Sequence, residues 1–443
     1  MANLTPFRGV RYDPTIVKDV AHVVAPPYDI IDANYQKALY ARHPNNIIRL
    51  ELGIEEPGDS PDQNRYTRAA VSLREWLKSG TLRRDSQPSL YLYMIEYRSP
   101  SDDAATPTRT LKGFFSTVEL EEFGTGRIFP HENTRSAAKA DRLHLLEACH
   151  ANFSAIFSLY SDSDNRVMQL LEKSVDLTTP RLDFQDDTGL RQRLWSISNP
   201  TVVQAVHDLM KPKPLFIADG HHRYETSLRY RQLRREQDAA HSKSHTGLQP
   251  YDSVLMLFAA LEDPGLTVLP THRVLTHAIP GLDQIKTVLK DAFDVQEIPF
   301  QPSEKDARSH FLHLLRRQGQ SGTVFGLAIR DARAYLLLSL RPDHRPPVTA
   351  SERDKLDVSI LQQEIVGKLC VTSTEQETIV YTKDDHEALD LVHQQKATGA
   401  LLLNATKVSE VQAVAASGGR MPHKSTYFFP KPLTGLVINV MED

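Results

Sequence analysis

The sequence has little cysteine and no long apolar run. Only Cys149 and Cys370 occur among 443 residues, and no CxxC or Cys/His ligand spacing surrounds either. A disulfide scaffold and a structural zinc site are therefore not expected, and a reducing compartment fits. No apolar stretch approaches the roughly 20 residues of a membrane-spanning helix. The first residues lack the charged and then apolar pattern of a signal peptide. We expect a cytoplasmic protein with no membrane partner.

The chain also lacks an excess of positive charge. It carries 52 Lys and Arg against 56 Asp and Glu, a formal net charge of -4. Proteins that bind nucleic acids through phosphate contacts usually show a basic footprint, so a nucleic-acid partner is not expected. With 40% hydrophobic and 24% charged residues the composition is that of a globular protein. The length favours two or three domains.

Apolar runs alternate with helical patterns and predict an α+β (mixed α/β) fold. Strands are predicted at 89–97, 113–120, 153–160, 215–218, 253–260, 324–329, 378–381, 400–403 and 435–440. Helices are predicted at 136–150, 200–210, from the 219–223 motif to about 236, and at 283–293 and 356–369. Polar stretches at 98–110 and 237–250 read as connections. We expect an N-terminal α/β region (1–110), a central catalytic domain (111–236) and a C-terminal α/β domain (251–443).

The strongest chemical signal is Asp-Gly-His-His-Arg at 219–223, directly after a buried strand. Asp219 is expected to cap the following helix, and Gly220 allows a sharp turn and a close approach to a ligand. The start of a helix offers N–H groups and partial positive charge, which suit an anion. His221, His222 and Arg223 are cations or potential cations in this first turn, where they are disfavoured unless an anion is present. The pattern therefore predicts a phosphate-binding turn, with Arg223 exposed to the ligand and contributing little to core packing.

Two alternatives remain for this motif. In the first, Asp219 is only a cap and the histidines are surface groups without a ligand. In the second, one histidine binds a metal together with distant residues, as in a hydrolase. Adjacent helical residues point roughly 100° apart, so His221 and His222 cannot both face one metal ion.

A second candidate is the turn Phe-Pro-His-Glu-Asn-Thr at 129–134. The carboxylate of Glu132 suits a general base, although a glutamate in a loop is more often only solvated. The following segment contains Lys139, Asp141 and Arg142, which look like an exposed helix face from which a basic side chain could reach phosphates.

The order strand, Pro-His-Glu, helix, strand and Asp-Gly-His-His-Arg resembles ADP-dependent free-serine kinases of the ParB/sulfiredoxin fold group. The likeness covers residues 111–231 and implies a ParB/sulfiredoxin-like central domain. It implies that Glu132 is the base toward a serine hydroxyl. Asp219, His221, His222 and Arg223 would form the phosphate and Mg²⁺ site, with Asp219 as the metal ligand and ADP or ATP as co-substrate. The substrate contacts expected beside this site are His131, Thr134 and Arg142.

The whole chain resembles the family called domain of unknown function 1015. The residues that carry this resemblance are Pro6–Gly9, Pro27–Asp29, Asn46–Leu50, His131–Thr134, Lys139–Arg142, Pro270–Arg273 and Pro422–Phe428. Basic and hydroxyl groups within these motifs could line a cleft and hold an anionic substrate, though each is more often a structural ion pair or turn. They are Arg8, Arg49, His272, Arg273 and the run Lys424, Ser425 and Thr426.

We therefore expect a nucleotide-dependent phosphotransferase that acts on a small hydroxylated metabolite, with serine or phosphoserine as the first candidate. One alternative is a phosphohydrolase, in which Glu132 or a histidine activates water. Another is a non-catalytic nucleotide-binding regulator, because some members of the fold group bind CTP and DNA. The sequence leaves self-association into a homo-oligomer open.

Overall fold

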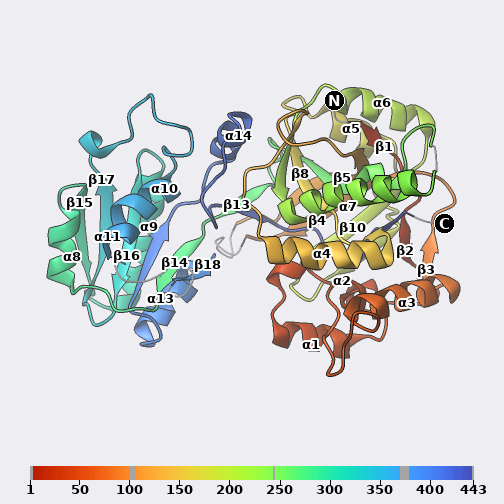
Figure 1. Ribbon diagram of the computed structural model, residues 1–443. Helices are drawn as coiled ribbons and strands as arrows, with labels where there is room; N and C mark the ends of the chain where they lie inside the picture. Colours follow the sequence, from red (N-terminus) through yellow and green to blue (C-terminus); the bar gives the residue numbers. More distant parts are fainter. Residues whose placement is uncertain (1–2, 100–105, 243–244, 370–378, 442–443) are drawn as a thin grey trace. The chain divides into compact units, whose positions relative to one another are not determined.

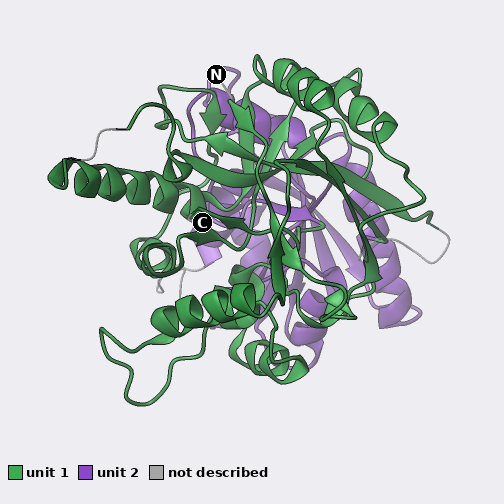
Figure 2. Cartoon of the chain, turned by 90° about the vertical axis from the view of Figure 1, so that its right-hand side faces the viewer, with its two compact units in different colours: residues 1–98, 106–266, 430–443 green, residues 99–105, 267–429 purple. Residues whose placement is uncertain are grey.

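The computed structural model describes residues 3–99, 106–242, 245–369 and 379–441, so Cys370 and Thr378 lie outside the described residues. The chain divides into two compact units (Figure 2). Unit 1 comprises residues 1–98, 106–266 and 430–443, and unit 2 comprises residues 99–105 and 267–429.

This division differs from the three regions expected from the sequence. The boundary placed at residue 110 falls within β5 (Arg109–Glu119), which pairs with β4 (Leu90–Tyr97) on one side and with β12 (Ser253–Ala260) on the other. The N-terminal region and the central region therefore share one sheet. The last fourteen residues, expected in the C-terminal domain, belong to unit 1 as well.

The main sheet of unit 1 runs in the order β6-β11-β8-β12-β5-β4-β10-β9, with β1 also paired to β5. Its pairs are antiparallel except β11 with β6 and β12 with β8, so the sheet is mixed. The remaining strands of this sheet are β1 (Leu4–Thr5), β6 (Ile128–Phe129), β8 (Ile156–Tyr160), β9 (Leu182–Gln185), β10 (Arg191–Ile197) and β11 (Leu215–Asp219).

The central strands follow from apolar sequence. All residues of β4 except Glu96 are buried, and so are all residues of β12 except Ser253. Strands between two neighbours with both faces covered carry continuous apolar runs rather than strict alternation. Because each of these strands has a partner on both sides, its backbone groups find hydrogen bonds within the sheet despite their burial.

Helices and shorter elements complete unit 1. Residues of α5 and α6 pack into the main apolar cluster of the sheet, and α4 lies beside α7 (Figure 1). The helices are α1 (Ala33–Arg42), α2 (Ile48–Glu51), α3 (Arg65–Lys78), α4 (Ser136–Cys149), α5 (Arg166–Lys173), α6 (Pro200–Met210) and α7 (His221–Ala240). Short 3-10 turns are η1 (Val20–His22), η2 (Tyr28–Ile30) and η3 (Pro250–Asp252).

The last fourteen residues return to unit 1 as an extended segment. Its strand β21 (Asn439–Val440) pairs with β7 (Ala151–Asn152), and it is shorter than the strand predicted at 435–440. Backbone bridges also join Ile438 to Val10 and Thr434 to Ala25. Val10 is the first residue of β2 (Val10–Tyr12), which forms a two-stranded ribbon with β3 (Leu82–Arg84).

Unit 2 contains a six-stranded sheet in the order β15-β17-β16-β19-β14-β18. Helices α9 and α13 pack against it around a second apolar cluster that includes Phe311 and Leu389. The strands are β14 (His272–Leu275), β15 (Phe293–Pro299), β16 (Val324–Ile329), β17 (Ala334–Leu340), β18 (Ile379–Thr382) and β19 (Gly399–Leu403), and a separate ribbon joins β13 (Thr267–Leu269) to β20 (Tyr427–Phe429). The helical elements are α8 (Leu282–Leu289), α9 (Glu304–Gly319), the 3-10 turn η4 (Pro342–His344), α10 (Asp357–Leu361), α11 (Gly367–Leu369), α13 (Asp385–His393) and α14 (Val408–Ala416).

Two helical predictions in unit 2 are corrected in detail. The helix expected at 283–293 ends at Leu289, and Phe293 begins β15. The helix expected at 356–369 is interrupted by a π-helical turn at Gln362–Val366, between α10 and α11.

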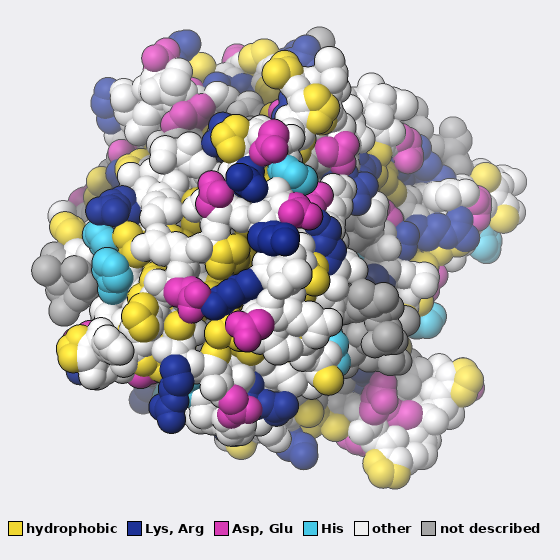
Figure 3. All heavy atoms as spheres, turned by 90° about the vertical axis from the view of Figure 1, so that its left-hand side faces the viewer, with side chains coloured by type: hydrophobic (Ala, Val, Ile, Leu, Met, Phe, Trp, Pro, Cys, Tyr) yellow, Lys and Arg dark blue, Asp and Glu magenta, His cyan; other side chains and the backbone are white. Residues whose placement is uncertain are grey.

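None of the helices in the described part of the chain is long and apolar enough to cross a membrane. The surface face drawn in Figure 3 intersperses acidic and basic side chains, in keeping with the near balance of charge in the sequence.

Candidate functional site

The segment 215–223 forms a strand, a tight turn and a helix, as the sequence predicts. Buried β11 ends at Asp219, Gly220 adopts a φ of 96°, and α7 begins at His221. A positive φ of this kind favours glycine. A Cβ atom at Gly220 would also lie only 3.0 Å from Nη2 of Arg223. The first-turn N–H groups of α7 therefore follow a turn that only glycine fits well.

Asp219 does not cap α7, contrary to expectation. Its Oδ1 accepts a hydrogen bond from Lys431 Nζ at 2.6 Å, and its Oδ2 accepts one from Arg223 Nη2 at 2.6 Å. Burial alone would raise the pKa of Asp219, but the charges of Lys431 and Arg223 hold it well below its usual value. Asp219 is therefore the ionised centre of a buried ion cluster.

These contacts also argue against Asp219 as a magnesium ligand. Both of its carboxylate oxygens already face a cation, whereas protein-bound Mg²⁺ needs free carboxylate oxygens in near-octahedral geometry. The described residues contain no group of three or more His, Cys, Asp or Glu side chains that could hold a metal ion. Both oxygens of Asp219 are thus engaged by protein cations rather than open to a metal ion.

Arg223 is more buried than its first-turn position predicts. Its side chain is 10% exposed, and Nη1 donates to the carbonyl oxygen of Ala155. The sequence predicts an exposed arginine whose removal leaves the fold intact. Because Arg223 instead joins α7 to Asp219 and to the segment before β8, its loss should also lower stability.

Both histidines of the motif contact the loop that carries Glu132. His221 Nε2 accepts a hydrogen bond from the backbone N–H of His131 at 3.1 Å, and His222 Nε2 accepts one from Arg135 at 2.9 Å. When neutral, each ring that accepts at Nε2 carries its proton on Nδ1. Burial lowers the pKa of His222, which favours this neutral form. The two rings thus fix the loop on either side of Glu132.

Glu132 lies next to the start of α7. Its Oε2 is 3.6 Å from His221 Nδ1, and its side chain is 36% exposed. The Glu132 carboxylate therefore stays accessible while the backbone that carries it is held in place. This is the arrangement that a general base needs, because the base must reach a substrate proton from a fixed position.

His131 is fully buried, in contrast to its expected role as a substrate contact. Its ring meets His221 edge-to-face, with centroids 4.6 Å apart. A side chain without exposed surface does not touch a substrate in this conformation. His131 instead packs beneath the Glu132 loop.

Thr134 and Lys139 converge on Glu225 of α7. The Thr134 hydroxyl and Lys139 Nζ each donate to Glu225 Oε2, both at 2.7 Å. Thr134 therefore lies at the edge of the candidate site, with its hydroxyl engaged by a residue four positions after His221.

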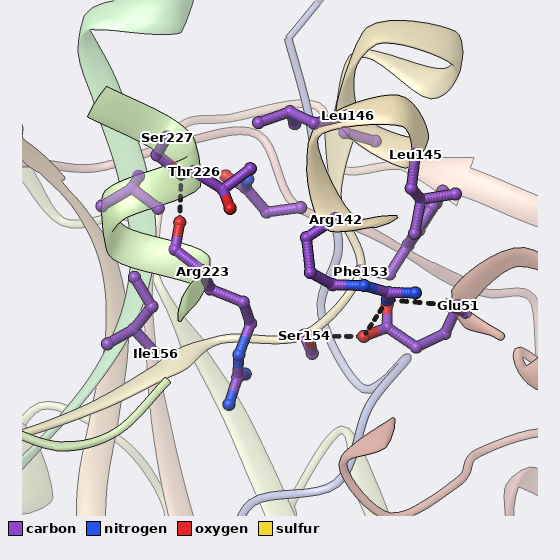
Figure 4. Close-up of a pocket in the computed structure, with 13 residues that line it drawn as sticks. Glu51, Arg142, Leu145, Leu146, Phe153, Ser154, Ile156, Arg223, Thr226 and Ser227 are labelled. Carbon is purple, nitrogen blue, oxygen red and sulfur yellow. Dashed lines mark hydrogen bonds and ion pairs between the residues drawn. The ribbon is translucent and has the colours of Figure 1, made fainter. Parts of the chain in front are cut away.

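Arg142 is buried rather than part of an exposed helix face. Its guanidinium lies 3.4 Å from Glu51 Oε1 and donates to Asp141 Oδ2, and it stacks over the ring of Tyr28 at 4.3 Å. Ser154 donates to the same Glu51 oxygen at 2.9 Å. Figure 4 shows Arg142 and Glu51 pointing toward one another beside a pocket that both residues line.

This pocket is a small cavity of about 40 Å³. It has room for a few water molecules but not for a nucleotide. Its lining residues are Glu51, Arg142, Leu145, Leu146, Ala151, Asn152, Phe153, Ser154, Ile156, Arg223, Thr226, Ser227 and Val254. This cavity is therefore too small to be a nucleotide site.

The sequence interpretation did not include four residues that the structure brings to this region. Glu51, Glu225 and Lys431 have been described above, and the fourth, Asp29, accepts a hydrogen bond from Lys431 Nζ at 2.7 Å. Asp29 stands in a Pro-Pro-Tyr-Asp turn, which by itself indicates only backbone geometry and family membership. Lys431 follows a proline in Phe-Phe-Pro-Lys-Pro, a context with no local signal for chemistry.

The other basic candidates lie elsewhere. Arg8 donates to the carbonyl oxygen of Asp85, and Arg49 donates to that of Tyr40 while stacking over the Tyr40 ring. In unit 2, Arg273 donates to the carbonyl oxygen of Lys424, so these two motifs are neighbours. His272 is buried there and faces Asp385 at 2.7 Å, and Ser425 and Thr426 follow Lys424 in the same unit.

With this geometry established, comparison with known proteins identifies the family. The family model described as "Protein of unknown function (DUF1015)" matches residues 4–359. The chain belongs to this family. None of the curated proteins matches this DUF1015 chain.

Solved structures similar to this DUF1015 protein are remote. A conserved hypothetical protein from Pyrococcus furiosus is 12% identical, with 74% of this chain and 95% of that chain covered and a TM-score of 0.34. A mutant free serine kinase in complex with ADP is 10% identical, with 78% and 98% covered and a TM-score of 0.36. SbnI from Staphylococcus aureus is 10% identical, with 74% and 87% covered and a TM-score of 0.34.

Proposed function

We propose that this DUF1015 protein is a nucleotide-dependent phosphotransferase that acts on a small hydroxylated metabolite, with serine as the first candidate. The observation that carries the proposal is the position of Glu132. Its accessible carboxylate lies 3.6 Å from His221, the first residue of α7. The carboxylate proposed as the base and the helix start proposed to bind phosphate thus lie side by side, although they are far apart in sequence.

The start of α7 supplies what bound phosphates need. The N–H groups of its first turn point out of the helix and carry partial positive charge. His222 lies in this turn, and Arg135 and Lys139 stand in the segment facing it. Phosphoryl transfer depends mainly on such positioning and charge stabilisation.

In the proposed reaction, Glu132 takes the proton of the acceptor hydroxyl, and the hydroxyl oxygen forms a bond to the terminal phosphorus of the nucleotide. The bond from that phosphorus to the bridging oxygen breaks, and its electron pair leaves with the shortened nucleotide. The products are the phosphorylated metabolite, the shortened nucleotide and protonated Glu132, which returns its proton to solvent.

We still predict that the activity requires Mg²⁺, but we expect the nucleotide phosphates, rather than Asp219, to be the ligands of the ion. Nucleotide phosphates themselves bind Mg²⁺, and such sites usually keep several waters on the ion. We expect activity with Mg²⁺ or Mn²⁺ and no stoichiometric zinc in the purified protein. The checks are metal analysis and activity after removal of tightly held zinc.

The proposed activity can be tested directly. The protein is incubated with Mg²⁺, serine and either ADP or ATP, and ³¹P NMR follows the nucleotide and phosphoserine. Stoichiometric phosphoserine supports the proposal. If the nucleotide, or phosphoserine added as substrate in a second assay, releases only inorganic phosphate, the protein is a phosphohydrolase. Nucleotide binding without turnover of any tested hydroxyl compound would instead favour a regulator.

A further inference from the structure

Lys431 is the second residue of the segment that returns from unit 2 to unit 1. Its Nζ lies 2.6 Å from Asp219 Oδ1 and 2.7 Å from Asp29 Oδ2, and its side chain is 9% exposed. These partners are 212 and 402 residues away along the chain. A single buried ammonium thus joins the Asp-Gly-His-His-Arg motif to the Pro-Pro-Tyr-Asp motif.

The two carboxylates depend on this ammonium. Their oxygens that face Nζ are at most 5.3 Å apart, the sum of the two N–O distances. Burial by itself would lower the pKa of Lys431, but Asp219 and Asp29 raise it, so the side chain stays charged. Without it, two like charges would face each other, with Asp219 at 18% side-chain exposure and Asp29 at 39%.

The contacts continue from both carboxylates into the candidate site. Asp219 holds Arg223, which in turn donates to the backbone at Ala155. Tyr28, next to Asp29, lies under the guanidinium of Arg142. The ammonium therefore helps to set the position of the Gly220 turn through Asp219. The Glu132 loop has its own hydrogen bonds, from the backbone N–H groups of His131 and Arg135 to the rings of His221 and His222.

The return segment itself is anchored by its backbone. Val10 and Ile438 exchange two hydrogen bonds of 2.9 Å, and Ala25 and Thr434 exchange bonds of 3.3 and 2.8 Å. Loss of the Lys431 side chain therefore leaves these main-chain bonds in place. A substitution at this position tests the ammonium rather than the docking of the segment.

We propose that Lys431 is a positioning residue that holds Asp219 and Asp29 so that the start of α7 is shaped for the nucleotide. This proposal rests on the proposed function. It makes the last fourteen residues, which the chain supplies only after unit 2, an integral part of the site. Lys431 acts through Asp219 and is not itself assigned a contact with substrate.

The experiment compares Lys431→Met, Lys431→Arg and the double variant Lys431→Met with Asp29→Asn in the full chain. The matched control is Lys213→Met. Lys213 is also a partly buried lysine of unit 1, 20% exposed and paired with Asp162, but it precedes β11 at the end opposite Asp219. The readouts are the ADP dissociation constant by calorimetry, KM for serine, and Tm.

Lys431→Met should raise the ADP dissociation constant about two- to thirty-fold, the range for a residue that acts on a site without touching the ligand. KM for serine should change less than about two-fold, because the Glu132 loop is held by the histidines. Lys431→Arg and the double variant should recover part of the nucleotide affinity. Lys213→Met should lower Tm without weakening ADP binding.

Two results separate this inference from the proposed function. If Lys431→Met lowers Tm but leaves the ADP dissociation constant unchanged, Lys431 is only structural and the inference is overturned. If the unmodified protein binds no nucleotide, the proposed function fails. In that case the Tm values still test the arrangement of charges around Lys431. A higher Tm for the double variant than for Lys431→Met would support the role of Lys431 in holding the two carboxylates together, and an equal or lower Tm would overturn it.

Discussion

Charged side chains are buried to different degrees in two ion clusters, one in each unit. In unit 1 the ion cluster around Asp219 joins segments up to 402 residues apart, and none of Lys431, Asp219 and Arg223 is more than 18% exposed. In unit 2 the network of Glu304 and Arg308 lies on the faces of α9 and α13, with side chains 15–48% exposed.

The difference bears on function. Burying charge costs desolvation, and a buried ion pair is often no more stabilising than apolar side chains of similar volume. The network on α9 and α13 is adequately explained as a staple between two helices. The cluster in unit 1 converges from distant motifs on the start of one helix, where it shapes a turn, and it is therefore the better candidate for a site.

The largest expected effect is on turnover, which should fall on loss of a glutamate in unit 1 but not in unit 2. Glu132→Gln keeps size and hydrogen bonding but removes the base, so turnover should fall by roughly 10²–10⁴ with nearly unchanged nucleotide affinity. The matched control is Glu304→Gln in unit 2, which should leave turnover unchanged. Steady-state kinetics and nucleotide titration check both. Near-normal turnover of the Glu132 variant would contradict the phosphotransferase proposal.

The second effect concerns stability. Arg142→Met leaves Glu51, 3% exposed, without its cation, and removal of one partner of a buried pair costs about 3–5 kcal/mol. Arg308→Met removes a partly exposed pair in unit 2 and should cost about 1 kcal/mol or less. Urea unfolding of both variants measures the difference. Equal losses would show that the two clusters are energetically alike.

The third effect isolates the turn before α7. Gly220→Ala must adopt a positive φ and also displace the Arg223 guanidinium, so we expect a loss of about 1–2 kcal/mol together with weaker nucleotide binding. Gly418 in unit 2 also has a positive φ, of 74°, but no atom of the described residues lies within 4 Å of its Cβ position. Gly418→Ala should therefore show the backbone strain alone, in thermal unfolding, with normal nucleotide affinity. Similar binding by both variants would argue against a close approach at Gly220.

Local elements were the predictable part of this molecule. The run 215–218 followed by Asp-Gly gives a buried strand, a turn and a helix because hydrophobicity and glycine act over a few residues. The roles of individual polar residues were less predictable. Arg142 sits among charged neighbours in the sequence and reads as exposed, but Glu51 and Tyr28 bury it from another part of the chain.

The partners of Asp219 illustrate the limit most clearly. A carboxylate before a helix usually caps that helix, and local sequence offers no reason to expect otherwise. Here Lys431 reaches it only because unit 2 is inserted before the last fourteen residues and the chain then returns. Such long-range convergence depends on topology, which periodicity and spacing do not encode.

The smallest expected effect is on the pH dependence of stability, and it concerns two aspartates whose pKa values are shifted in opposite directions. Burial raises the pKa of Asp357 in unit 2 to about 6, although the hydroxyl of Thr323 donates to its carboxylate, whereas the cations beside Asp219 lower the pKa of that group. A raised acid pKa in the folded state means that its contribution to stability is fully present below about pH 4 and is lost as pH rises through 6. Asp357→Asn removes the charge, so its stability relative to the unmodified protein should increase between pH 4 and pH 6, by on the order of 1 kcal/mol. Exposed Asp354→Asn is the control, and urea unfolding at several pH values measures both. If Asp357→Asn showed no gain above pH 6, the Asp357 carboxylate would have a compensating partner at neutral pH, and the contrast with Asp219 would be lost.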